Sequence, residues 1–108
     1  MTRATKLEQR WQAAVRWAVD VVGVSDWDSR FHVETTLDRG QTLACVRIEP
    51  EFHRAIYVLN GDFSAKPTDD ELRALAVHEA EHVWQHEHEE AQADHVAEVA
   101  RRALQIKP

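Results

Sequence analysis

The C-terminal part of the chain most constrains the fold, because residues 68–107 contain neither proline nor glycine. Thr68 and Glu71 have the spacing of a capping box, and acidic residues in the first turn complement the positive end of a helix dipole. Apolar residues then recur at helical spacing. We predict a helix that begins after Thr68, a break near residues 86–88, and a second helical segment over residues 89–106. One unbroken helix would leave part of its apolar stripe without a partner in so small a domain.

The first of these helices contains the motif His78-Glu79-x-x-His82. Residues four apart lie on one helical face, so both histidine rings can direct a nitrogen at one metal ion, and Zn–N bonds of about 2.0–2.1 Å fit that spacing. Glu79 is rotated by about 100° from His78, on the side of the apolar stripe, and is placed to take a proton from a water held by the metal. The motif therefore predicts Zn²⁺ bound by His78 and His82, with Glu79 as general base.

Upstream of the motif, the pattern changes from helical to alternating. Residues 5–23 have apolar side chains at helical spacing, with Gly23 as the stop. Residues 31–37 and 42–48 alternate as half-buried strands and are expected to pair as a hairpin, and residues 54–59 form a third strand. The predicted fold is α+β in a single domain: an N-terminal helix, a small three-stranded mostly antiparallel sheet, the motif helix and a C-terminal ligand-bearing helix.

Charge and cysteine content exclude several classes of function. The chain of 108 residues has a formal net charge of −6, and residues 69–98 hold ten acidic side chains against one basic side chain. Such a segment repels phosphate backbones, so we expect no nucleic-acid partner. Cys45 is the only cysteine, so no internal disulfide forms. No stretch approaches the roughly 18 apolar residues of a membrane span, and we expect a cytoplasmic protein without a membrane partner.

The motif His78-Glu79-x-x-His82 resembles that of the zincin metallopeptidases. Downstream, Glu90-Ala91-Gln92-Ala93-Asp94 is similar to the Glu-x-x-Ala-Asp element of gluzincins such as the CAAX prenyl proteases, and to the acidic ligand helix of ImmA/IrrE-like peptidases. The resemblance implies a minimal gluzincin-like fold, with Glu90 as third metal ligand and Asp94 as a carboxylate that orients a histidine ring.

Other residues compete with Glu90 for the third position at the metal. His88 lies six residues after His82, where the resemblance to metzincins places a third histidine, and Asp94 and Glu89 are further candidates. A histidine at position 86 continues the i, i+4 ladder, but it lies about 12 Å along the helix from His78 and cannot share one ion with it. A catalytic zinc site usually has three protein ligands and keeps one position open, so one of these residues must return to the site.

These features predict a zinc-dependent metallopeptidase that hydrolyses a peptide or protein substrate. The resemblance to zincins implies that an edge strand, expected at residues 54–59, aligns the extended substrate by β-pairing. Tyr57, His53 and His95 are the candidates for a group that stabilises the oxyanion. One alternative is a catalytically silent, zincin-fold protein with a metal-binding or regulatory role. Another is a small α+β domain whose acidic, histidine-rich helix has no specific metal site.

Overall fold

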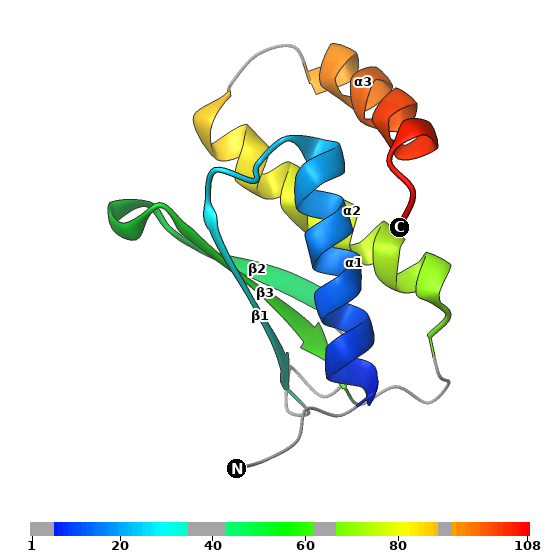
Figure 1. The fold of residues 1–108 in the computed structure, drawn as a ribbon. Coiled ribbons are helices and arrows are strands. Elements are labelled where there is room, and N and C mark those ends of the chain that lie inside the picture. The colour runs from blue at the N-terminus through cyan, green and yellow to red at the C-terminus, as the bar shows by residue number, and fades with distance from the viewer. Residues whose placement is uncertain (1–5, 35–42, 62–66, 89–91) are drawn as a thin grey trace.

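The computed structural model describes residues 6–34, 43–61, 67–88 and 92–108, with only the backbone described for residues 92–94. These residues form three α-helices, one short 3-10 helix and three strands (Figure 1). In chain order they are α1 (Lys6–Val22), β1 (Asp28–Glu34), β2 (Ala44–Glu49), η2 (Pro50–Phe52), β3 (Arg54–Asn60), α2 (Asp69–Glu87) and α3 (Gln92–Gln105). The predicted α+β class and the order of helix, strands and two C-terminal helices are confirmed.

The three strands form one sheet in the order β1-β3-β2, which corrects the expected strand pairing. β2 is antiparallel to β3, whereas β1 runs parallel to β3, with Phe31 opposite Tyr57. The prediction that the first two strands pair as a hairpin was therefore wrong. The short turn through η2 and His53 joins β2 to β3, and such a tight connection can only bring consecutive strands together as antiparallel neighbours. Where a mostly antiparallel sheet was expected, the two pairs are one parallel and one antiparallel.

The position of β3 corrects a second expectation, that residues 54–59 are an edge strand. β3 has β1 on one side and β2 on the other, so its backbone hydrogen-bonding groups are already used on both sides. The edges of the described sheet are β1 and β2. β1 also begins at Asp28, earlier than predicted, where the Asp28 carboxylate accepts a hydrogen bond of 3.0 Å from Arg54 Nε of β3.

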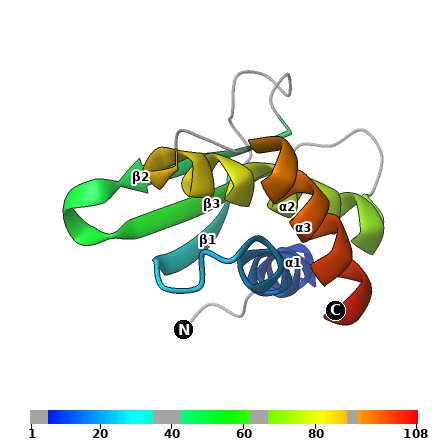
Figure 2. The ribbon, with the colours of Figure 1, turned by 90° about the horizontal axis from the view of Figure 1, so that it is seen from above.

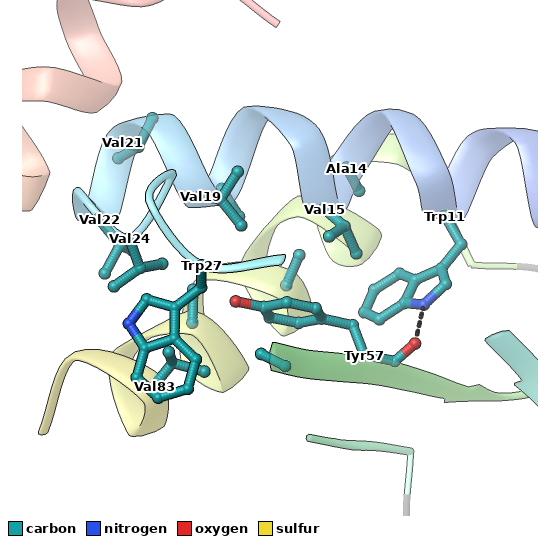
Figure 3. Packing of buried hydrophobic residues seen from close by; sticks show 14 of the residues in the cluster. Trp11, Ala14, Val15, Val19, Val21, Val22, Val24, Trp27, Tyr57 and Val83 are labelled. Carbon is teal, nitrogen blue, oxygen red and sulfur yellow. Dashed lines mark hydrogen bonds between the residues drawn. The ribbon is translucent and has the colours of Figure 1, made fainter. Parts of the chain in front are cut away.

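One hydrophobic core lies between the sheet and the two longest helices. α1 and α2 pack against each other on the same side of the sheet (Figures 1 and 2). Trp11 of α1 is fully buried, and its Nε1 donates a hydrogen bond of 3.1 Å to the carbonyl oxygen of Tyr57 (Figure 3). Tyr57 points from the central strand into the space between these helices. The central strand of the sheet is therefore tied directly to α1 by a hydrogen bond.

Helix α2 begins and ends as its sequence predicts. The Thr68 side chain accepts a hydrogen bond from the Glu71 backbone N–H, and the Glu71 carboxylate accepts one from the Thr68 N–H, so both halves of the capping box are formed. The helix ends at Glu87, and His88 is its C-cap in an extended conformation. The predicted break near residues 86–88 is confirmed. None of the described helices is both long enough and apolar enough to cross a membrane.

Helix α3 docks on the end of α1 and beside α2, on the side away from the sheet (Figures 1 and 2). The indole of Trp17 donates a hydrogen bond of 2.6 Å to the Ile106 carbonyl, and Arg102 Nη1 donates one of 3.4 Å to the Val21 carbonyl. Helix α1 stops at Gly23, which has a φ of 89°. A Cβ atom there would lie 2.6 Å from Arg102 Nη1, so glycine serves both the turn and the docking of α3.

Candidate metal centre

The residues that the motif singles out come together on α2. One ligand atom from each of His78, Glu79 and His82 lies within 4.8 Å of the others, the one such group found among the described residues. The two imidazole rings stand edge to face, with centroids 4.9 Å apart and an interplanar angle of 87°. This arrangement follows from the helix itself, because residues four apart are one turn apart on the same face.

The three side chains differ in their exposure to solvent. His78 and His82 are exposed, whereas Glu79 is buried, with 6% of its surface accessible. Glu79 belongs to the core-facing stripe of α2 together with Leu72, Ala76, Ala80 and Val83. The site therefore lies at the boundary between the core and the surface, with the carboxylate on the inner side and the histidines on the outer side.

Burial governs the proton affinity of Glu79. Removal of its carboxylate from water raises its pKa above the ordinary value of 4.5, because desolvation disfavours the charged form. Positive charge on His82 and then on His78 acts in the opposite direction, and the effect of burial is the larger one. A carboxyl group with a raised pKa beside two histidines is a candidate general base.

The donor set fits a divalent transition metal. Imidazole nitrogen and carboxylate oxygen are both ligands of Zn²⁺, and two donors in a tetrahedral zinc site lie roughly 3.4 Å apart when each bond is about 2.1 Å long. The ligand nitrogens of His78 and His82 are no more than 4.8 Å apart, so small rotations of these two exposed side chains are enough to bring them to that separation. The group suits other imidazole-binding metals as well, and the donors alone do not choose among them.

The candidates for a third ligand are only partly covered by the structure. Glu89 and Glu90 lie outside the described residues, and Asp94 is placed on α3 without a described side chain. Their roles stay predictions. His86 and His88 are described, and neither belongs to the group formed by His78, Glu79 and His82.

His88 is held by Trp84 instead. The two rings stack with centroids 4.3 Å apart and an interplanar angle of 4°. The His88 ring also hydrogen-bonds the Trp84 carbonyl oxygen through Nδ1, at 2.9 Å. Since the helix ends at Glu87, His88 turns back onto its own last turn, which does not support a third ligand of the metzincin type.

Trp84 also forms the joint between α2 and α3, where it stacks on His95. This contact was not predicted from the sequence. The His95 ring stacks on Trp84 at 3.6 Å, while its Nδ1 lies 2.9 Å from Glu81 Oε2 and its Nε2 lies 3.0 Å from the Val22 carbonyl oxygen. His95 is buried, with 5% of its surface accessible. Both ring nitrogens are therefore used to join α3 to α2 and α1. The spacing of Trp84 and His88, four residues apart, was the available signal for part of this stack.

None of the three candidates for an oxyanion donor belongs to the group formed by His78, Glu79 and His82, which is called the metal group below. His95 is committed to the joint described above. His53 stacks on Trp27, with Nε2 3.1 Å from Asp26 Oδ2 and Nδ1 3.6 Å from Glu87 Oε1, at the C-terminal end of α2. Tyr57 is fully buried, whereas His78 and His82 are exposed to solvent. His32 is exposed on β1, and like His53 it is not part of the described metal group.

Comparison of the chain with protein-family models, with curated proteins and with solved structures finds no match.

Proposed function

We propose that the chain is a zinc-dependent metallopeptidase that hydrolyses peptide bonds, with His78 and His82 as metal ligands and Glu79 as general base. One observation carries the proposal: two exposed histidines one helical turn apart share a site with a buried carboxylate, all three within 4.8 Å. Glu90 is the preferred third ligand by its resemblance to gluzincins, with Asp94 and Glu89 as alternatives.

In the proposed chemistry, His78 and His82 bind the metal and Glu79 transfers the proton. A bound Zn²⁺ would supply acidity to a water molecule and polarise the scissile carbonyl. Glu79 accepts the proton of the attacking water on a carboxylate oxygen and later passes it to the leaving amine. Its raised pKa suits this exchange, because a carboxyl group of higher proton affinity is a better base once it is ionised. His78 and His82 must be neutral at the nitrogen that binds the metal.

The substrate needs an edge strand near the metal group, and β2 replaces residues 54–59 in that role. Among the described strands, β2 pairs on one side only and contacts α2, whereas β1 contacts α1. An extended peptide that added to β2 would gain main-chain hydrogen bonds along the helix that bears the motif. Peptide or protein is therefore the proposed class of substrate.

Peptide hydrolysis by the purified chain tests this function. Wild-type protein loaded with zinc should cleave members of a mixed peptide library, and a chelator should abolish the cleavage. Glu79→Gln should retain the metal and lose activity by roughly 10²–10⁴-fold, since a positioned general base contributes that much. Full activity of Glu79→Gln, or activity that survives chelation, would reject the mechanism.

The alternative is a catalytically silent metal-binding or regulatory protein, and the exposure of both histidines favours it. His78 and His82 lie on the outer surface of α2, whereas catalytic sites are usually concave and bury much of their ligand. In this case the chain binds zinc through His78 and His82, no peptide in the library is cleaved, and Glu79→Gln changes neither property.

A further inference from the structure

Strand β1 has a free edge in the described sheet. It pairs with β3 on one side, and no described strand lies on its other side. Three consecutive residues of β1, Arg30, Phe31 and His32, are exposed to solvent. Because successive side chains of a strand point to opposite faces, this exposure means that both faces of the sheet are open along β1. An exposed edge strand of this kind can pair with a strand of another chain.

The backbone of β1 directs hydrogen-bonding groups to this edge at alternate residues. The Asp28 N–H donates to the His53 carbonyl oxygen, on the β3 side, at 2.8 Å. At the other end of the strand, the Glu34 carbonyl oxygen accepts from the Gly61 N–H at 2.7 Å. In an extended strand, successive residues direct their N–H and C=O groups to opposite sides. The residues whose backbone groups point to the free edge are therefore Ser29, Phe31 and Val33.

A second copy of β1 fits this edge in one antiparallel register. A two-fold interface brings the same segment of both copies together, so each contact occurs twice. When His32 lies opposite His32 of the second copy, Arg30 lies opposite Glu34. In the same register Phe31 lies opposite Val33, and these two residues exchange backbone hydrogen bonds. Opposite charges then meet on one face of the sheet and apolar side chains meet on the other, and both kinds of cross-strand pair are stabilising.

The neighbouring registers of the same pairing fit less well. A shift that places Phe31 opposite Phe31 brings Asp28 opposite Glu34, and a further shift brings Arg30 opposite Arg30. Like charges directly opposite each other are destabilising. A shift in the other direction leaves Arg30 and Phe31 without a partner within β1, which ends at Glu34. Charge complementarity therefore selects the register that is centred on His32.

We propose that the free edge of β1 is a self-association surface, through which two copies of the chain form an antiparallel, two-fold symmetric pair centred on His32. The sheets of the two copies then join into one continuous sheet. Because β2 lies at the opposite edge, it stays free in the pair. The interface is one strand of seven residues, so the pair should dissociate on dilution. The proposal depends on neither the metal group nor the proposed peptidase function.

Sedimentation equilibrium of the full chain tests the association. The mass of the wild type should rise from 12.4 kDa toward twice that value as its concentration is raised to about 1 mM. Arg30→Glu should raise the dissociation constant about tenfold, because each pair contains the contact between Arg30 and Glu34 twice. Arg30→Glu combined with Glu34→Arg should restore association, since the charges are again complementary. Arg101→Glu, exposed on α3, is the control and should leave the dissociation constant unchanged.

A wild type that stays monomeric up to this concentration would overturn the proposal, and the edge would then be open to a different extended segment. Association that Arg30→Glu leaves unchanged would also overturn it, because the contact would then lie on another surface.

Disulfide trapping tests the register without a charge reversal. In a Cys45→Ser background, which removes the native thiol, His32→Cys should give a disulfide-linked pair under oxidising conditions. Directly opposed residues of a non-hydrogen-bonded antiparallel pair have Cα atoms about 4.5 Å apart, which suits a disulfide. Arg30→Cys is the matched control, because position 30 lies opposite position 34, and the two cysteines would be roughly 13 Å apart. Equal yields from both variants, or no linked pair from His32→Cys, would overturn the proposed pairing.

Discussion

Glu79 occupies a position on α2 that the packing of the helix would otherwise give to an apolar side chain. Leu72, Ala76, Ala80 and Val83 make up the rest of the buried stripe, and a carboxylate among them is costly when it is ionised. The neighbouring histidines reduce this cost only in part, because the effect of burial on the Glu79 pKa is the larger one. A costly residue within an otherwise regular stripe is typical of a functional site.

The free-energy cost of ionising the buried Glu79 carboxyl predicts how the stability of the metal-free protein depends on pH. A carboxyl pKa that is higher in the folded than in the unfolded state means that stability is lost as the pH rises through the folded-state pKa. Glu79→Gln removes this loss. The melting temperature of the variant should therefore equal or fall below that of the wild type near about pH 4 and exceed it near about pH 7.

Thermal unfolding across this range, with a chelator present, provides the measurement. Glu51→Gln, on the exposed turn η2, is the control and should show no comparable divergence. A difference in melting temperature between Glu79→Gln and the wild type that stays constant with pH would show that burial does not raise the pKa of the Glu79 carboxyl.

At the scale of the elements, α2 is defined at both ends by local sequence. The reciprocal capping box of Thr68 and Glu71 fixes its start. At its end, the C-cap residue His88 stacks on Trp84 of the last turn. These features keep His78 and His82 one turn apart within a continuous helix. The metal group is therefore positioned by an element whose limits the sequence specifies.

Loss of the cap should weaken the protein without removing the metal group. Thr68→Ala should lower the free energy of unfolding by about 1 kcal/mol, and Thr68→Ser should restore most of it, because serine offers the same oxygen. Chemical denaturation measures both variants. Equal stability of Thr68→Ala and the wild type would mean that the capping box does not stabilise α2.

The docking of α3 depends on His95, whose ring contacts α2 and α1 together. His95→Ala should destabilise the protein by about 2–3 kcal/mol, since it leaves Glu81 and the Val22 carbonyl without a partner. Hydrogen–deuterium exchange should become faster in α3 than in α1. His32→Ala, on the exposed surface of β1, is the control. Exchange that increases equally in α1 and α3 would argue against a separate docking of α3.

At the scale of the whole molecule, the elements were predictable from the sequence, and their arrangement was predictable only in part. The helical or alternating spacing of apolar residues indicates which face of a segment is buried and which element it forms. For this reason α1, the three strands and the break after α2 were predicted. The pairing of β1 with β3 was not, because an alternating pattern identifies a strand but does not select its partner. The burial of Glu79 followed from helical spacing, whereas the commitment of His88 and His95 to Trp84 depends on ring contacts that spacing alone does not reveal.

The arrangement places His78 and His82 on the outer face of a helix whose inner face packs against α1 and the sheet. Substitution of an exposed histidine should therefore change metal binding without unfolding the core, which separates loss of a ligand from loss of structure. His86 offers a matched control, since it is exposed on the same helix, one turn beyond His82, and lies outside the described group.

Elemental analysis of protein purified without an affinity tag, after zinc has been offered, tests the central claim most directly. We expect stoichiometric zinc in the wild type and in His86→Ala, loss of zinc in His78→Ala, and weaker retention in Glu90→Ala. Absence of stoichiometric metal from the wild type, or equal retention by His78→Ala and His86→Ala, would contradict a metal site formed by His78 and His82.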